Sequence, residues 1–222
     1  MSDLAWSYSR LKTFEECPKK FYHLNVKKDV KDAPSEAMEA GTRDHKSLEL
    51  RVKNGDALPA HLASLEPLCQ VFDIAKQRGH EVLTECQWAF TRDFQPTGWF
   101  DRNVWVRVIL DAGMVGTTKA IVIDWKTGKR NPDWDQLKLF AASAFIRSPD
   151  LKSVTAQFIW TKDGSEDSEI YEAGQAPDIW AEFLPRVERL QEANRTNNWP
   201  KTPNRLCGWC PLFKQHKCTG DK

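Results

Sequence analysis

A run of β-forming residues that ends in an acid and a lysine constrains this chain most strongly. Residues 119–126 read Lys-Ala-Ile-Val-Ile-Asp-Trp-Lys. Because residues two apart share a face of a strand, Asp124 and Lys126 are predicted to project side by side, while Ile121 and Ile123 face a core. A carboxylate and an ammonium held in this way can bind a divalent cation and activate water beside it, although solvated strand ends show the same pair.

Two preceding segments are predicted to form strands of the same sheet. Residues 104–115 are rich in β-branched side chains, and an antiparallel hairpin would bring Asp111 near the acid and lysine. In residues 81–90, alternation puts Glu85 on the face opposite the aromatic side chains. Three carboxylates on neighbouring strands repel one another unless a cation or a lysine lies among them. A turn residue for Asp111 and a solvated face for Glu85 are the alternative interpretations.

Helical periodicity places two more polar side chains of interest. Gly41 and His45 lie one turn apart on the same face of a predicted helix that ends at Asn54-Gly55, so the glycine can admit a close neighbour beside the imidazole. Gln136 lies beside the apolar stripe of a second helix, residues 133–147. A structural role is the alternative for a single histidine in a helix.

The remaining segments complete an α/β pattern in which helices flank a central mixed β-sheet. No repeat or low-complexity segment interrupts it. Further helices are predicted at residues 7–28, with a break or a fresh first turn at Pro18, at 60–78 and at 177–197. Further strands are predicted at 151–162 and 168–173.

Four of the six cysteines form a candidate ligand set from the two ends of the chain: Cys17, Cys207, Cys210 and Cys218. The sequence opens without a signal-peptide pattern and has no long apolar run, so we expect no membrane association and a reducing, cytoplasmic compartment. Clustered cysteines there favour a metal over a disulfide. Four thiolates suit an iron–sulfur cluster and equally suit zinc. Cys69 and Cys86 fall on apolar faces and are expected in the core.

Charge does not mark the whole chain as a nucleic-acid binder. Its 32 lysines and arginines face 31 acids, for a formal net charge of +1. A DNA-binding surface must therefore be local. If a metal joins the two ends, basic residues there form one surface for phosphates, although each cluster alone reads equally as a solvated face. These residues are Arg10, Lys12, Lys19, Lys20, Lys27, Lys28, Lys201, Arg205, Lys214 and Lys217.

The motifs together resemble the PD-(D/E)xK nuclease superfamily in its RecB-like exonuclease branch. In chain order they are Tyr8-Ser9-Arg10-Leu11 to Cys17-Pro18, Gly41-x-x-x-His45, Asp111, Asp124-x-Lys126-Thr127-Gly128, Gln136-Leu137 and the cysteine cluster. No single motif is specific, but their order over most of the chain is. The resemblance implies a single nuclease domain, residues 1–222, with a restriction-endonuclease-like core. Residues 1–28 and 199–222 would form a cysteine-ligated appendage that joins the two termini.

The resemblance also implies a catalytic metal site. It assigns metal binding to Asp111 and Asp124, to the carbonyl of Trp125, and to His45 as the extra histidine of the exonuclease branch. Glu85 is the best match for the family's glutamate between the histidine and the first aspartate. Hard oxygen ligands of this kind favour Mg²⁺ or Mn²⁺.

Two further catalytic roles follow from the resemblance. Lys126 matches the lysine that orients or deprotonates the attacking water and offsets charge on the phosphate. Gln136 matches the glutamine of the helix that lies against the active site and DNA. That motif usually ends in tyrosine, whereas Phe140 stands at the position here.

The cysteine cluster resembles the iron–sulfur staple of AddB-type helicase–nucleases and of CRISPR spacer-acquisition nucleases. There, one N-terminal and three C-terminal cysteines hold a 4Fe–4S cluster. Those proteins usually have five residues between the last two cysteines, whereas seven separate Cys210 from Cys218 here, and His216 stands where the last cysteine would fall. A Cys3His zinc site is therefore an open alternative, as is a disulfide between Cys207 and Cys210.

These observations predict a Mg²⁺- or Mn²⁺-dependent deoxyribonuclease, an exonuclease of phage or bacterial recombination or repair. Its substrate would be DNA that is single-stranded or has accessible ends, delivered in the bacterial or phage-infected cell by a helicase or recombinase. The competing hypothesis is a catalytically silent protein on the same fold that binds DNA or a partner, such as a phage inhibitor of host nucleases. A zinc-stapled interaction module is the third hypothesis.

Overall fold

The computed structural model describes residues 3–220, and the chain divides into two compact units. Unit 2 is the continuous segment Glu36–Ala181. Unit 1 combines the N-terminal segment up to Ser35 with the C-terminal segment from Glu182 onward. Unit 1 therefore includes the two segments predicted to form the cysteine-ligated appendage, residues 1–28 and 199–222. It also includes residues 29–35 and 182–198. Among the described residues, no helix combines the length and apolar character needed to cross a bilayer.

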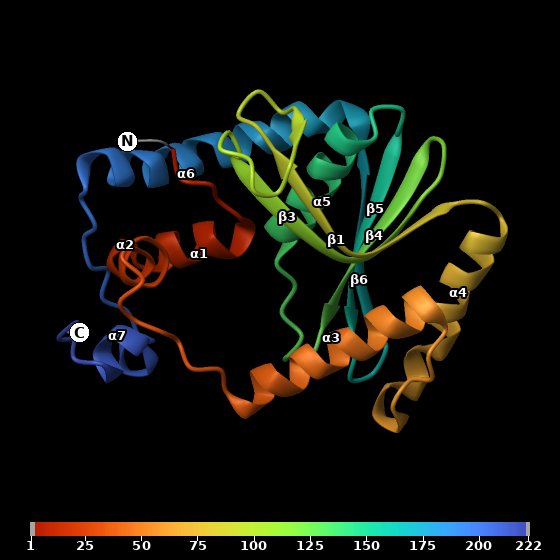
Figure 1. The fold of residues 1–222 in the computed structure, drawn as a ribbon, viewed down its shortest axis with the longest axis horizontal. Coiled ribbons are helices and arrows are strands. Elements are labelled where there is room, and N and C mark those ends of the chain that lie inside the picture. The colour runs from red at the N-terminus through yellow and green to blue at the C-terminus, as the bar shows by residue number, and fades with distance from the viewer. Residues whose placement is uncertain (1–2, 221–222) are drawn as a thin grey trace. The chain divides into compact units, whose positions relative to one another are not determined.

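A six-stranded mixed sheet forms the centre of unit 2 (Figure 1). Its strands are β1 (Glu81–Phe90), β2 (Pro96–Thr97), β3 (Val106–Val115), β4 (Lys119–Lys126), β5 (Ser153–Trp160) and β6 (Glu166–Glu172). The spatial order is β2-β1-β3-β4-β5-β6, and only β4 and β5 are parallel. A parallel pair needs a crossover connection, which the helix between β4 and β5 supplies.

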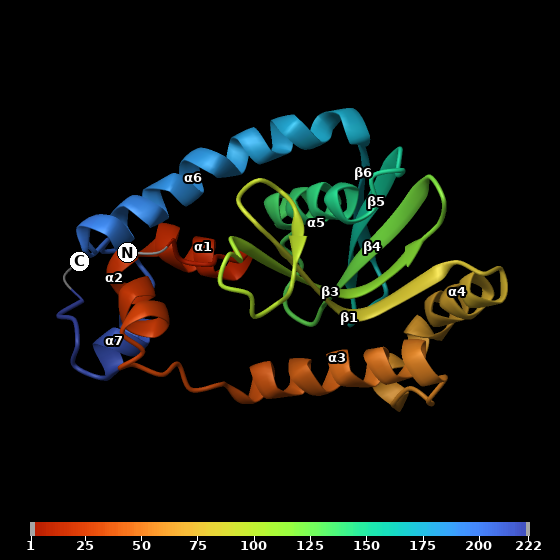
Figure 2. The same ribbon diagram turned by 45° about the horizontal axis from the view of Figure 1, so that its top comes forward.

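Helices cover both faces of this sheet. In unit 2 they are α3 (Glu36–Asn54), α4 (Glu66–Gln77), α5 (Trp134–Arg147) and the first residues of α6 (Ala176–Thr196), with short 3₁₀ turns at Ala60–Leu65 and Ala173–Gln175. Figure 2 shows α5 on one face of the sheet and α3 with α4 on the other. Leu48 of α3 and Phe72 of α4 pack in one buried cluster with Ile123 and Trp125 of β4. The predicted inward direction of Ile121 and Ile123 is confirmed, since both contribute to this cluster.

Unit 1 is built around aromatic side chains from the two ends of the chain. Its elements are α1 (Tyr8–Glu16), α2 (Pro18–Phe21), a π-helical turn (Tyr22–Val26), the later part of α6, a 3₁₀ turn η4 (Cys207–Trp209) and α7 (Pro211–Lys214). The ring of Trp6 stacks on Phe183 with centroids 6.0 Å apart, and Phe21 stacks on Trp199 at 5.7 Å. Such aromatic pairs join segments that are distant in the sequence into one hydrophobic core.

The predicted α/β architecture, a central mixed sheet flanked by helices, is confirmed in detail. Pro18 does begin a fresh helix, as expected, because its ring fits the first helical turn. The two-residue strand β2 was not predicted, since so short a strand leaves no periodic signal. Cys69 is buried as predicted, but Cys86 is only half-buried, so its assignment to the core was wrong.

Candidate active site

The candidate site lies where strands β3 and β4 part. Their ladder ends at the pair Ala112 and Ile123, and the next residues are Asp111 on β3 and Asp124 on β4. Beyond that point the backbone N–H of Trp125 donates to Oδ2 of Asp111 at 2.8 Å. A carboxylate thus replaces a backbone acceptor of the ladder, which fixes the Asp111 side chain beside Asp124. The predicted meeting of these two acids across a hairpin is what the structure contains.

Three side chains of β4 and α5 form a closed network beside these acids. Nζ of Lys126 lies 2.6 Å from Oδ2 of Asp124 and donates to Oε1 of Gln136 at 3.0 Å. Nε2 of Gln136 in turn donates to Oδ1 of Asp124 at 2.8 Å. The ammonium also lies 4.7 Å from the ring centroid of Phe158, within the range of a cation–π interaction. Lys126 is therefore held on three sides before any substrate binds.

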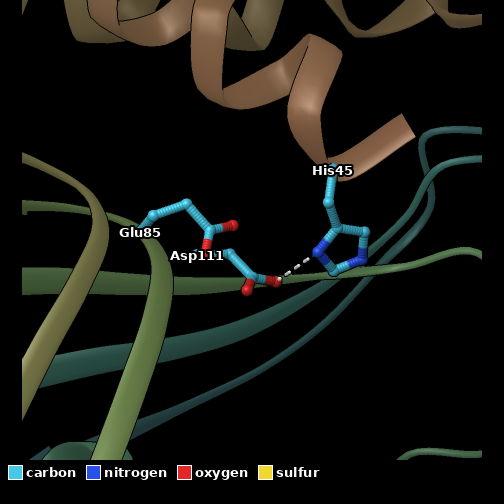
Figure 3. Close-up of side chains that lie close together, drawn as sticks. All are labelled: His45, Glu85 and Asp111. Carbon is cyan, nitrogen blue, oxygen red and sulfur yellow. Dashed lines mark ion pairs between the residues drawn. The ribbon is translucent and has the colours of Figure 1, made fainter. Parts of the chain in front are cut away.

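A second group of side chains converges on Asp111 (Figure 3). His45 of α3, Glu85 of β1 and Asp111 each offer one ligand atom, and these atoms all lie within 4.8 Å of one another. Nδ1 of His45 is 3.4 Å from Oδ2 of Asp111, and Figure 3 shows the imidazole directed towards that carboxylate. His45 and Asp111 are 66 positions apart in the sequence, yet they meet in one place, as the predicted site requires.

The backbone is distorted at Glu85, which has a φ of 44°. The ladder between β1 and β3 is intact on either side, with the pairs Thr84–Ala112 and Cys86–Leu110. Glu85 therefore lies opposite Asp111, at the one interior position where no pair forms. Like charges directly opposite each other destabilise a sheet, and a positive φ costs a further 1–3 kcal/mol, roughly. Strain of this kind persists where the surroundings impose it, and functional sites are the usual place.

The electrostatics of the site show an excess of negative charge in a poorly solvated place. Burial, with the charge of Asp111 added, raises the pKa of Asp124 to about 6, against the opposing effect of Lys126. Burial and the same neighbour raise the pKa of Glu85. Burial lowers the pKa of His45, but its hydrogen bond and ion pair with Asp111 outweigh that effect and raise it. A cation among these groups would stabilise the ionised carboxylates.

The donor set fits a hard divalent cation. Carboxylate oxygens and an imidazole nitrogen are ligands that Mg²⁺ or Mn²⁺ accept. Oδ2 of Asp124 is buried, and among the described residues its polar contact is the ion pair with Lys126. It therefore keeps lone-pair capacity for a further partner. No contact of the Trp125 carbonyl with this group is defined, so its role as a ligand stays a prediction.

The stability of the metal-free protein should depend on pH through Asp124. Its pKa in the folded chain, about 6, lies above the ordinary value of 3.8, so the folded state holds a proton that the unfolded state loses between these values. The free energy of unfolding should therefore fall as pH rises from 4 to 7, by up to about 3 kcal/mol from this group. Chemical unfolding of wild type and Asp124→Asn across this range measures it. The variant should gain stability over wild type as pH rises, and parallel pH curves would contradict the burial argument.

A close contact between α3 and the end of β4 positions His45. A Cβ added at Gly41 would lie 2.7 Å from Oγ1 of Thr127, so only glycine lets the helix approach this closely. His45 follows one turn later on the same face. The predicted close neighbour of Gly41 is thus the residue directly after Lys126.

Gly41→Ala should lower activity without lowering stability. The added methyl favours the helix by up to about 1 kcal/mol but pushes α3 from Thr127, and a displacement of the order of 1 Å can cost about 10²-fold in rate. Adding Thr127→Ala removes the clashing oxygen and should restore cleavage, whereas Thr127→Val keeps a methyl there and should not. Cleavage rates and melting curves of the four proteins decide this. Equal activity of Gly41→Ala and wild type would show that the contact is dispensable.

The four predicted cysteine ligands line one cavity of about 190 Å³ in unit 1. All are free, and backbone N–H groups of Thr202 and Asn204 donate to the sulfur atoms of Cys17 at 3.4 Å and Cys207 at 3.2 Å. Hydrogen bonds to sulfur are a common feature of metal-bound thiolates. His216 does not line this cavity.

Two side chains of the site were not predicted. Phe158 reaches Lys126 because β5 runs parallel to β4 and pairs Phe158 with Asp124. Thr127 supports α3 through Gly41. One sequence signal could have placed Phe158 beside Asp124 and Lys126. It is the strand–helix–strand pattern between residues 119 and 160, which is typical of two parallel strands.

Comparison with known proteins agrees with this geometry. A sequence profile of the PD-(D/E)XK nuclease superfamily matches residues 5–214. The chain belongs to this superfamily. No curated protein matches the sequence. The crystal structure of a putative exonuclease from Eubacterium rectale resembles the nuclease fold of this chain with a TM-score of 0.54 and 12% identity, over 98% of this chain and 90% of that one.

Two further solved structures are similar at lower TM-scores. The protein SSO0001 has a TM-score of 0.41 and 13% identity, over 100% of this chain and 89% of that one. An alkaline exonuclease (LHK-Exo) from Laribacter hongkongensis has a TM-score of 0.31 and 11% identity, over 87% of this chain and 92% of that one.

Proposed function

We propose that this protein is a Mg²⁺- or Mn²⁺-dependent deoxyribonuclease of the RecB-like exonuclease branch. The observation that carries the proposal is the convergence of Asp111, Asp124, His45 and Glu85 beside an immobilised Lys126. A site that only bound DNA would gain nothing from concentrating carboxylates, since they repel phosphate. The same carboxylates are useful where a divalent cation must be held against a phosphodiester.

The residues divide the work of hydrolysis between them. Asp111, Asp124 and His45 would hold the cation, with Glu85 beside them. The cation supplies charge stabilisation at the phosphate oxygens and polarises water when bound. Lys126, an ammonium paired with Asp124, is placed to orient the attacking water and to offset charge on the phosphate, and Gln136 keeps it in position. The proton of the water passes to the leaving oxygen. Water then adds to the phosphorus as the bond to the leaving oxygen breaks, which divides one phosphodiester into a phosphomonoester and a hydroxyl.

End-labelled DNA tests the activity and its mode together. Metal-stripped protein should leave DNA intact, and added Mg²⁺ or Mn²⁺ should release labelled nucleotides or short oligonucleotides. Linear single-stranded, linear duplex and circular single-stranded substrates separate an exonuclease from an endonuclease, because a circle has no end to attack. Asp124→Asn serves as the inactive control from the same purification. If DNA stays intact with either metal while the protein binds it, the silent DNA-binding protein is the correct interpretation instead.

We further propose that Cys17, Cys207, Cys210 and Cys218 hold a 4Fe–4S cluster. Support comes from the shared cavity and the N–H donors to two of the sulfurs. Among the residues that the structure describes, no three cysteine sulfurs lie within 4.8 Å of one another. Tetrahedral zinc would hold its sulfurs about 3.8 Å apart. At least one pair in every set of three cysteine sulfurs is therefore further apart than a shared zinc ion would hold it. Iron and zinc analysis of anaerobically purified protein distinguishes the cluster from zinc.

A further inference from the structure

The net charge of the chain is close to zero, but its two units carry net charges of opposite sign. Unit 1 carries 15 lysines and arginines against 9 acids, a formal net charge of +6. Unit 2, which contains the candidate active site, carries 17 against 22, a formal net charge of −5. A polyanion is therefore repelled by the unit with the carboxylate cluster and attracted by the unit with the cysteines. Any electrostatic capture of nucleic acid belongs to unit 1.

The positive charge of unit 1 is concentrated in one groove. A cavity of about 590 Å³ is lined by nine residues, of which four are lysines and none is an acid. The lining residues are Lys19, Lys201, Gly208, Phe213, Lys214, His216, Lys217, Cys218 and Thr219. We call this cavity the lysine groove. It combines lysines from both ends of the chain, as the sequence predicts for a basic surface.

Three of the four lysines of the groove are poorly neutralised. Within the part of the chain that the structure describes, neither Lys19 nor Lys214 forms an ion pair, and Lys217 has only a distant one, with its Nζ 3.8 Å from Oδ2 of Asp29. Ammonium groups gathered without acids repel one another. Phosphate oxygens are partners that relieve this repulsion, and their binding releases condensed counterions.

Exposed aromatic side chains lie beside the groove. Phe213 lines it and is 43% exposed. Trp209 belongs to the same short segment of η4 and α7 and is 76% exposed. It lines the cysteine cavity, which shares Phe213 and Cys218 with the groove. Large aromatic rings in water are costly to maintain, and unpaired bases are natural partners for their faces. In a duplex the base faces are already stacked on one another, so this arrangement selects single strands.

We propose that the lysine groove binds the phosphate backbone of a single-stranded nucleic acid, with Trp209 and Phe213 stacking on its bases. The nature of this ligand rests on the proposed nuclease function, but the groove is a binding site separate from the carboxylate cluster. Its lysines supply the attraction that the acidic unit lacks. Because the two units are one chain, capture by unit 1 raises the effective concentration of the strand for unit 2.

Fluorescence anisotropy with labelled oligo-dT and with a hairpin duplex tests the groove. The full-length chain is used with its cysteine-bound metal, without added Mg²⁺ or Mn²⁺, over a series of salt concentrations. Lys19→Glu/Lys214→Glu should weaken oligo-dT binding at least tenfold. The slope of log K against log salt should fall by about 1.4, the value for two lost contacts to a single strand. Lys12→Glu/Lys31→Glu makes the same charge change on unit 1 outside the groove and should change affinity less than threefold.

A separate variant tests the proposed stacking of bases on Trp209. Trp209→Ala should weaken oligo-dT binding about fivefold or more and leave duplex binding unchanged, because only unpaired bases stack. Equal losses in the two lysine pairs would mean that net charge alone attracts DNA, and would overturn the groove. Equal losses of oligo-dT and duplex binding in Trp209→Ala would overturn the single-strand preference. If the glutamate pair loses its bound metal, Lys19→Gln/Lys214→Gln repeats the test with a smaller perturbation.

The same measurements separate this inference from the nuclease assignment. A wild-type chain that binds oligo-dT through the groove but never cleaves DNA would reject the nuclease and keep the groove. A chain that cleaves DNA, and whose affinity is indifferent to the groove lysines, would reject the groove and keep the nuclease.

Discussion

Lys126→Ala should reduce DNA cleavage by about 10²–10⁴-fold while the protein stays folded and still binds DNA. The ammonium contacts Asp124, Gln136 and the ring of Phe158, and no other described lysine enters this cluster. Its removal leaves the attacking water without a side chain that orients it and the phosphate without a nearby positive charge. The loss should appear in the rate of a single turnover at saturating protein, which excludes weaker binding as the cause.

Lys119→Ala provides the matched control for this variant. Lys119 begins the same strand, β4, and is exposed at the end away from the cluster. It should cleave DNA at the wild-type rate. Digestion by Lys126→Ala at the rate of the Lys119→Ala control would contradict the assigned role of the ammonium. A lower melting temperature in Lys126→Ala alone would instead point to a loss of structure, which circular dichroism detects.

Cys17→Ser should lower the free energy of unfolding by about 4 to 5 kcal/mol, the largest stability effect expected of any single substitution here. The metal that we propose at Cys17 and the C-terminal cysteines would close nearly the whole chain into one loop and so restrict the unfolded state. By analogy with a disulfide over a loop of this length, the loss removes that restriction. Serine oxygen is a poor substitute for a thiolate, so the metal should leave as well.

Metal content and chemical unfolding measure this effect. Hydrogen exchange should quicken in both segments of unit 1, before Ser35 and after Glu182, because the joint between them is lost. Cys86→Ser is the control, since Cys86 is half-buried on β1 of unit 2 and takes no part in the cavity. Unchanged metal content and stability in Cys17→Ser would show that the four thiols line one cavity without binding a common metal.

The sequence predicts the polar face of the sheet well because a strand repeats every two residues. That period alone puts Asp124 beside Lys126 and away from Ile123, and the hairpin turn after β3 brings Asp111 opposite. Helical periodicity likewise places Gly41 on the face of His45. Each of these inferences needs only the local backbone geometry or one tight turn, and neighbouring residues determine that geometry.

The parts that sequence did not reveal depend on contacts between distant segments. Phe158 lies beside Lys126 through the parallel register of β4 and β5, which the packing of α5 sets rather than any local pattern. The contact of Gly41 with Thr127 spans 86 positions. The positive φ of Glu85 occurs where it faces an acid on another strand, a pairing that local sequence does not specify. The sequence predicts a basic surface from both chain ends, but that four of its lysines line a single groove without an acid follows only from the fold.

The position of Mn²⁺ in crystals of the protein tests the central claim most directly. Mn²⁺ substitutes for Mg²⁺ at oxygen-rich sites and can be located by its anomalous scattering. We predict a peak within coordinating distance of Asp111 and Asp124 and next to His45, and its loss in Asp111→Asn crystals treated in the same way. Mn²⁺ that binds elsewhere and leaves these three side chains without a metal would contradict the account.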